Sequence, residues 1–189
     1  MTPATLTEAD SHYPSRLRER LGDGAPLPLT ILGNPDLLAL RKVALFCSAR
    51  CPGHVILTAH DQAARWRDDG RCVIGGFHSP VEKECLSILL RGNQPVIICP
   101  ARGVESMRPP SHWRPPLMDS RLLVLSAFQK SQKRVTKSLA VDRNRLVAAL
   151  ADEVVFAHIA PGGHLDELRH AVTLWGIPNR VITEISAPR

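Results

Sequence analysis

Short apolar runs alternate with helical patterns from residue 43 onward, and this alternation limits the fold more than any other feature of the chain. Val43–Cys47 is an unbroken apolar run, which is typical of a strand buried on both faces. The segment 55–69 follows with its apolar residues on one helical stripe, and Gly70 is placed to end the helix. Further strands are predicted over residues 71–75, 94–99, 122–126, 153–158 and 180–183.

Helical patterns separate most of these strands. The pattern over 79–91 has a defined start, because Ser79 and Glu82 frame a capping box with proline between them. Two more helices are predicted over 139–151 and 165–175. Strands that alternate with helices indicate βαβ units. The sequence therefore predicts an α/β fold: a Rossmann-like open, mainly parallel sheet with helices on both faces.

The chain has 189 residues, a length that fits one domain. Residues 1–40 lack a long period and are interpreted as an N-terminal lead-in that packs on a domain over 41–189. Within this lead-in, 7–21 is expected to hold one short helix, and 25–29 is expected to be extended, because a residue before proline avoids the helical region. The segment 100–120 interrupts the rhythm with several prolines and is interpreted as either a functional or a mobile loop.

Composition narrows the class of protein. No apolar run is long enough to cross a bilayer and the N-terminus lacks the pattern of a secretory signal, so a cytoplasmic protein without a membrane partner is expected. The five cysteines are an odd, scattered set with no Cys-x-x-Cys pair, and no disulfide framework, metal or cofactor is predicted. No nucleophile–base–acid set stands out, which favours a binding protein over an enzyme. Trp113 is the one tryptophan considered for base stacking.

Positive charge is concentrated in one segment. The net charge of +6 permits a polyanionic partner. Between residues 129 and 145 only Asp142 opposes a group of basic side chains, which comprises Lys130, Lys133, Arg134, Lys137, Arg143 and Arg145. Two interpretations stay open: a solvated loop that runs into a helix, or a rim that binds phosphates. Arg143 and Arg145 are interpreted either as ligand contacts or as bridges to an acid that hold the helix.

Three predicted loops lead from a strand into a helix at the carboxyl ends of the strands, where open α/β sheets bind ligands. The first covers residues 47–53 and offers Ser48 and Arg50, whose side chains can donate to phosphate oxygens. A tight turn explains the same small residues. The spacing is not Gly-x-Gly-x-x-Gly, so the standard dinucleotide fingerprint is absent.

The second and third loops each place paired glycines just before a helix. Free N–H groups and the helix dipole make such a position a ready anion site, although the glycines also fit a role in close helix–strand packing. The candidate binding residues are Gly75, Gly76, His78 and Ser79 in the second loop and Gly162 and Gly163 in the third.

These stretches resemble the DNA-processing protein A (DprA/Smf) family over about residues 13–181. Arg143–Val147 reads Arg-Asn-Arg-Leu-Val and is similar to the family's Arg-Asn-Arg-Ile-Ile, the most specific match. His12–Leu17 resembles its Tyr-Pro-x-x-Leu entry, and Leu29–Asn34 resembles its Leu-Tyr-x-x-Gly-Asn.

Other positions depart from the family pattern. Cys-Ser-Ala-Arg at 47–50 stands where the family has Gly-Ser-Arg, and Gly-Gly-Phe at 75–77 stands where it has Ser-Gly-Leu/Met. Glu82 falls where the family carries an acid. The resemblance implies single-stranded DNA binding in a basic groove, a homodimer, and loading of the recombinase RecA in transformation or repair. The chain is expected to be a minimal, divergent member without the flanking domains of many relatives.

Two other functions stay open. One is a sensor that binds a nucleotide-derived ligand, which the glycine-rich loops support equally well. The other is a LOG-like nucleotide phosphoribohydrolase, whose motif is Pro-Gly-Gly-x-Gly-Thr-x-x-Glu. The chain matches its start at 161–163, but Arg169 stands where the glutamate belongs. Glu167 lies two residues early, which on a helix turns its carboxylate roughly 200° away.

Overall fold

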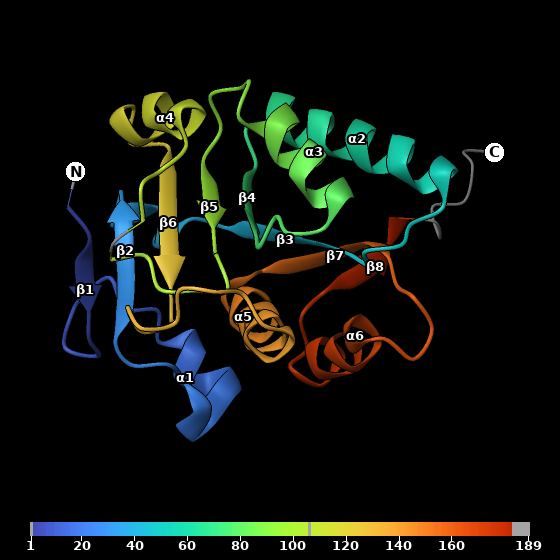
Figure 1. Cartoon of the computed structure of the whole chain (residues 1–189). Helices are drawn as coiled ribbons and strands as arrows, with labels where there is room; N and C mark the ends of the chain where they lie inside the picture. Colours follow the sequence, from blue (N-terminus) through green and yellow to red (C-terminus); the bar gives the residue numbers. More distant parts are fainter. Residues whose placement is uncertain (1, 106, 183–189) are drawn as a thin grey trace.

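The computed structural model describes residues 2–105 and 107–182, which form a single eight-stranded sheet with helices on both faces (Figure 1). The strand order is β1-β2-β6-β5-β4-β3-β7-β8. The strands are β1 Ala4–Leu6, β2 Leu29–Gly33, β3 Lys42–Cys47, β4 Cys72–Gly75, β5 Val96–Ile98, β6 Leu122–Ser126, β7 Glu153–His158 and β8 Asn179–Val181. The predicted Rossmann-like α/β class is confirmed.

The sheet is parallel except at one side. From β6 to β8 in this order every neighbouring pair is parallel, whereas β2 pairs antiparallel with β6 and with β1. Strand β3 lies between β4 and β7, and all six of its residues are buried. The carboxyl ends of β4, β3 and β7 therefore meet at one edge, because parallel neighbours end on the same side.

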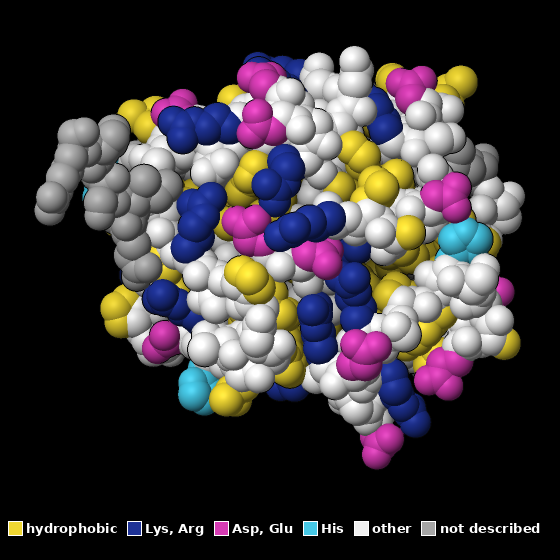
Figure 2. All heavy atoms as spheres, turned by 180° about the vertical axis from the view of Figure 1, so that it is seen from behind, with side chains coloured by type: hydrophobic (Ala, Val, Ile, Leu, Met, Phe, Trp, Pro, Cys, Tyr) yellow, Lys and Arg dark blue, Asp and Glu magenta, His cyan; other side chains and the backbone are white. Residues whose placement is uncertain are grey.

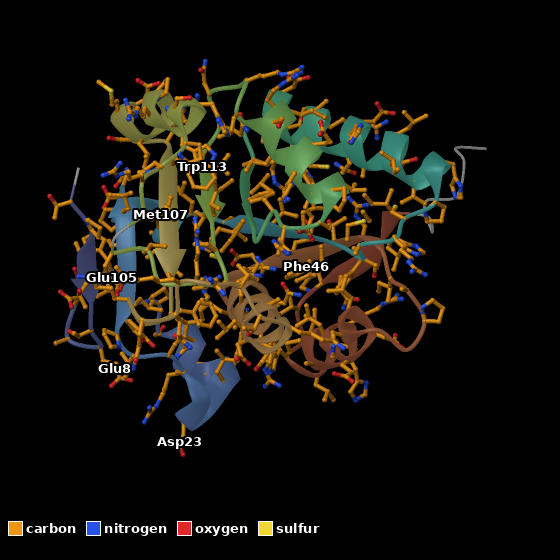
Figure 3. All side chains as sticks on the ribbon, viewed as in Figure 1. Glu8, Asp23, Phe46, Glu105, Met107 and Trp113 are labelled. Carbon is orange, nitrogen blue, oxygen red and sulfur yellow. The ribbon has the colours of Figure 1, made fainter. Side chains whose placement is uncertain are left out.

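Two layers of helices cover the sheet (Figure 1). One layer holds α2 Gly53–Asp68, α3 Pro80–Leu89 and α4 Arg114–Met118; the other holds α1 Arg16–Leu21, α5 Lys137–Leu150 and α6 His164–Leu174. Each layer packs on its own cluster of buried side chains. Phe46 belongs to the cluster beneath α5 and α6 (Figure 3), and its ring stacks on Phe156 with centroids 5.6 Å apart.

The first forty residues contribute more than the expected helix. Strands β1 and β2 join the sheet, although neither was predicted, because β1 is short and β2 follows a proline-rich stretch that hides its pattern. The helix expected within 7–21 is present as α1, confined to six residues. Leu17 of α1 is fully buried. The division at residue 40 stays a prediction.

The proline-rich segment 100–120 is partly helical. A 3-10 turn, Ser111–Trp113, leads into α4, which covers the sheet beside β6. Met107 and Trp113 pack against the buried cluster of this layer (Figure 3). The expectation of a loop throughout was therefore wrong, because Pro115 and Pro116 stand in the first turn of α4, where a missing N–H costs nothing.

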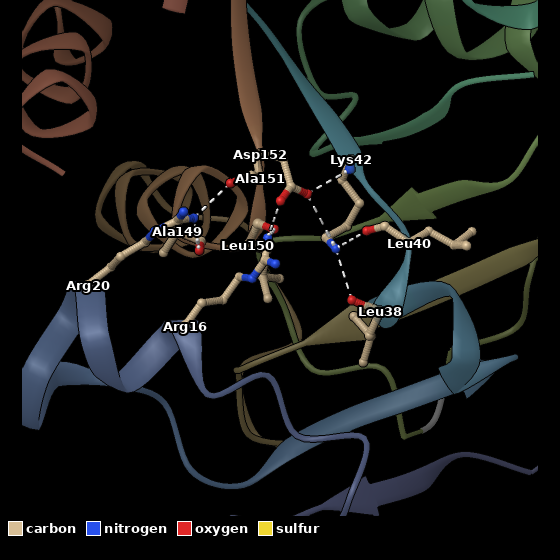
Figure 4. A network of polar contacts seen from close by, with 9 residues as sticks. All are labelled: Arg16, Arg20, Leu38, Leu40, Lys42, Ala149, Leu150, Ala151 and Asp152. Carbon is tan, nitrogen blue, oxygen red and sulfur yellow. Dashed lines mark hydrogen bonds and ion pairs between the residues drawn. The ribbon is translucent and has the colours of Figure 1, made fainter. Parts of the chain in front are cut away.

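A polar network joins the amino ends of β3 and β7 to α1 (Figure 4). The fully buried Lys42 ammonium donates to the carbonyls of Leu38 and Leu40 and lies 3.8 Å from Asp152 Oδ2. Asp152 also accepts from the Lys42 N–H and from Arg16, each at 2.8 Å. No helix of the described residues has the length and apolar character that crossing a membrane requires.

Candidate functional site

A cleft of about 380 Å³ opens where β3, β4 and β7 end. Residues from all three predicted loops line it, together with the first two turns of α5 and the first turn of α6. The lining residues are Cys47, Ser48, Ala49, Arg50, His78, Ser79, Glu82, Ala140, Arg143, Asn144, Ala160, His164 and Leu165. Five predicted site residues thus meet in one cleft: Ser48, Arg50, His78, Ser79 and Arg143.

The first and third loops are tied together at Ser48. Its N–H donates to the carbonyl of His158 at 3.0 Å, and its hydroxyl oxygen accepts from the N–H of Ala160 at 2.9 Å. The hydroxyl proton of Ser48 stays available for a ligand. Arg50 is exposed on the rim and forms no ion pair within the described residues.

The second loop is held by a carboxylate of the chain itself. Glu82 is 6% exposed and accepts from the N–H groups of Cys47 at 2.8 Å, His78 at 2.8 Å and Ser79 at 3.2 Å. Ser79 completes the capping box by accepting from the Glu82 N–H. The helix N-terminus that the sequence marks as an anion site therefore already holds an anionic side chain.

Arg143 reaches the cleft from α5. It is 4% exposed, and it donates to the Cys99 carbonyl at 3.3 Å and to Asn144 Oδ1 at 2.8 Å. A Cβ at Gly76 would overlap its guanidinium, so this glycine is required for the close approach.

Burial lowers the pKa of Arg143, while the charge of Glu82 acts in the opposite direction. Within the described residues no carboxylate lies within 4.0 Å of Arg143 or Arg145, which disfavours the role of an acid bridge.

The third loop leaves its helix start open. Gly162 adopts a φ of 66°, and Gly163 caps α6 without a side-chain hydrogen bond. The N–H groups of His164 and Leu165 have no hydrogen-bond partner in the described part of the chain. Both residues line the cleft, so this end of it offers free donors and the positive end of a helix dipole.

Three of the predicted cations, Lys133, Arg134 and Lys137, form a basic rim that lies beside the cleft rather than inside it. Lys133 and Arg134 line a separate hollow around Thr136, the N-cap of α5, and Lys137 is the first residue of that helix. All three cations are exposed and unpaired among the described residues. Arg145 is exposed too and lines a pocket between α5 and α6.

Two packed loops support this rim. The N–H of Gly103 donates to the Gln132 carbonyl at 3.0 Å, and the hydroxyl of Ser126 donates to the Arg102 carbonyl at 2.7 Å. A Cβ at Gly103 would overlap the Gln129 carbonyl. The loop that follows β5 thus fixes the start of the basic segment that follows β6.

The thiols of the buried cysteines have raised pKa values. Burial raises the pKa of the Cys47 thiol above its ordinary value, and the nearby Cys51 raises it further. The other buried cysteines behave alike, with burial raising the pKa of Cys85 and Cys99 to about 12. Within residues 2–105 and 107–182, no group of three or more His, Cys, Asp or Glu side chains could hold a metal ion.

Several lining residues were not among the candidates. Glu82 had appeared only as a helix cap and a family acid, and Asn144 only as part of a motif. His164, Ala140 and Leu165 carry no recognisable signal, because only the packing of α5 and α6 against the strand ends brings them together.

Comparisons with known proteins agree with this fold. Residues 4–174 match the family model described as DNA recombination-mediator protein A. The chain is similar to DNA processing protein A from Streptococcus pneumoniae, with 21% identity and a TM-score of 0.78 over 93% of this chain. It spans 61% of that protein. No protein with a curated description matches the sequence.

Two further solved structures are similar. DNA processing protein A from Helicobacter pylori, described for its single-stranded DNA binding mode, has 20% identity and a TM-score of 0.74, with 95% of this chain and 80% of that one covered. A molybdenum cofactor binding protein from Rippkaea orientalis has 11% identity and a TM-score of 0.50, with 74% of each chain covered. At these identities the likenesses show the fold alone.

Proposed function

The chain belongs to the DNA recombination-mediator protein A family, and on this premise we propose that it binds single-stranded DNA and acts in DNA processing or recombination. The binding surface is the cleft at the ends of β3, β4 and β7 together with the basic rim at the start of α5. The H. pylori relative, described for single-stranded DNA binding, supports the choice of ligand.

One observation supports the proposal most directly: exposed cations that have no ion pair among the described residues gather at the start of α5. The first turn of α5 contains no acid, although acids are the residues that a helix dipole favours there. Lys137 lies in that first turn, and Lys133 and Arg134 lie just before the N-cap, Thr136. Positive charge at this end of a helix costs free energy, because the dipole there favours anions. A bound phosphate backbone would offset that cost.

The cleft would hold one phosphate next to this rim. Ser48 and Arg50 are side-chain donors, and the N–H groups of His164 and Leu165, at the start of α6, have no hydrogen-bond partner among the described residues. Arg143 lines the same cleft, and its hydrogen bond to the Cys99 carbonyl fixes its position. It therefore contributes a positive charge at a fixed place. Contacts of this kind recognise the backbone and carry no base sequence.

We propose two partners beyond DNA on family membership: a RecA-type recombinase and a second copy of this chain. Neither has a contact surface that we assign. The oligomeric state in solution, measured by light scattering with and without oligo-dT, tests the second. A monomer in both conditions would remove the homodimer from the proposal.

The direct test is a titration with labelled oligo-dT at two salt concentrations. Affinity should fall with salt, with a slope of about −0.7 for each phosphate contact on single strands. Replacing Lys133, Arg134 and Lys137 together by alanine should weaken the affinity and make its dependence on salt less steep. The matched control replaces three exposed arginines near the amino ends of the strands, Arg41, Arg65 and Arg91.

The outcomes separate the candidate functions. Binding that the control triple leaves intact and the rim triple weakens supports the DNA role. Equal weakening by both triples would mean that only net charge matters. Absence of DNA binding, with AMP or ADP-ribose bound in calorimetry, would favour the nucleotide-derived ligand instead.

A further inference from the structure

Glu82 occupies the donors that a phosphate would use at the second loop. Its two carboxylate oxygens accept from Cys47 at the end of β3 and from His78 and Ser79 before α3. A helix N-terminus of this kind otherwise binds anions through the same N–H groups. The ligand phosphate must therefore sit on the other side of the cleft, toward Ser48, Arg50 and the start of α6.

The carboxylate cannot swing away from the ligand. Glu82 is 6% exposed, its side chain closes the capping box, and its backbone N–H is held by Ser79 Oγ. Three N–H donors hold the two oxygens in place. Glu82 lines the cleft itself, so any anion bound there lies near a fixed negative charge.

The charge of the cleft therefore suits a singly charged phosphate. Arg143 and Arg50 oppose the carboxylate of Glu82, which leaves a small positive excess from these three groups. An internal phosphodiester carries one negative charge, whereas a phosphate monoester carries about −1.5 to −2 near neutral pH. The second charge of a monoester would meet the carboxylate and find the donors at the start of α3 already occupied.

We propose that Glu82 is a specificity-determining residue that admits internal phosphodiesters of a DNA strand and excludes terminal phosphate monoesters and free mononucleotides. This inference rests on the proposed DNA function and deepens it. Two results should follow from this one structural cause: a 5′-phosphate on the oligonucleotide should not raise its affinity, and free nucleotides should compete weakly.

A pair of ligands that differ by one charge tests the proposal on the wild-type chain. Thymidine 5′-phosphate and its methyl ester compete against labelled oligo-dT, and the ratio of their inhibition constants is measured. The methyl ester should compete about tenfold better or more, because close like charges in a partly buried site repel strongly. Equal competition, no competition by either ester, or stronger competition by the monoester would overturn the proposal.

The variant Glu82→Gln tests the residue itself. It removes the charge and keeps an amide oxygen as acceptor, so the preference for the methyl ester should fall toward one. Glu84→Gln is the matched control, because Glu84 lies exposed on the same helix and outside the cleft. An unchanged ratio in Glu82→Gln, or the same change in Glu84→Gln, would contradict the assignment.

The DNA function and the role of Glu82 can fail separately. If oligo-dT binds and the monoester competes as well as its methyl ester, the inference fails and the DNA function stands. If oligo-dT does not bind at all, the proposed function fails and the inference falls with it. Should Glu82→Gln not fold, as circular dichroism would show, the wild-type ratio still decides.

Discussion

Two arginines near the amino ends of the strands share an acidic partner of a kind that exposed cations at the carboxyl ends lack among the described residues. Just before β4, Arg71 Nη2 lies 2.9 Å from Glu153 Oε2, and in β8 Arg180 Nε lies 3.8 Å from Glu153 Oε1. At the carboxyl ends, the exposed cations Arg50 and Lys137 have no acidic partner in the described part of the chain. Figure 2 shows one face where basic and acidic side chains lie interleaved near the centre.

The difference teaches that a count of charges does not locate a binding surface. Cations that neutralise an internal carboxylate hold the fold, and their positive charge is already balanced. Cations without such a partner keep their charge for an external anion. The buried Lys42, next to Asp152, is the clearest case of a cation with an internal carboxylate. The rim at the start of α5 is the clearest case of cations without one among the described residues.

The largest loss of stability is expected from Asp152, at the amino ends of β3 and β7. Asp152→Ala would leave the buried ammonium of Lys42 without its carboxylate and free Arg16 as well. Breaking one side of a buried pair costs about 3–5 kcal/mol of the free energy of unfolding. Urea denaturation measures this loss, with the exposed Asp69→Ala as the control. A loss under about 1 kcal/mol, the range of surface pairs, would show that the pairing is incidental.

A smaller loss of stability is expected from Gly76, which lies against the guanidinium of Arg143. Gly76→Ala places a Cβ into the space of the Arg143 guanidinium. The guanidinium is the far end of a flexible side chain and can shift, so we expect a cost of about 1 kcal/mol, the low end for overpacking. Affinity for oligo-dT should fall with it, because Arg143 moves. Gly53→Ala is the control, since nothing lies within 4 Å of its Cβ position. Unchanged stability and affinity in Gly76→Ala would contradict the tight approach.

Low pH should also weaken the interactions of Asp152 with Lys42 and Arg16, though less than removal of the Asp152 side chain does. Burial raises the pKa of Asp152, but hydrogen bonds from the Lys42 N–H and Arg16 outweigh it, and the net pKa is lowered. A carboxylate with a lowered folded pKa stabilises above its unfolded pKa, and this stabilisation is lost as pH falls through the folded value. The urea midpoint of the wild-type chain should therefore fall more steeply in acid than that of Asp152→Asn. Parallel pH profiles would contradict this.

The smallest effect is expected from a single cation of the rim. Lys137→Ala should weaken oligo-dT binding a few-fold and reduce the salt slope by about 0.7, the share of one phosphate contact. The stability of this variant should differ from that of the wild type by less than about 0.5 kcal/mol, because the Lys137 side chain is exposed and has no ion pair with any residue that the structure describes. A slope that stays constant would place the DNA path elsewhere.

Much of the fold was predictable because its local signals are strong. The buried run of β3, the capping box of α3 and the glycine stop after α2 each act within a few residues. Strands β1 and β2 and helix α4 were missed. Their stability comes from pairing with β6 or from packing on the sheet, and no local period reveals it.

The candidate site was predictable only in outline. The three loops and Arg143 were identified, since strand order in an α/β fold brings such loops together. The sequence by itself determined the α/β class, the three loops between strand and helix and the basic segment, because period, capping and charge are local properties of neighbouring residues. Only the tertiary structure decided which N–H groups and which cations stay free. Glu82 reaches across to Cys47, and Asp152 to Lys42 and Arg16. Hydrogen bonds and ion pairs depend on distance in space, and residues far apart along the chain set that distance.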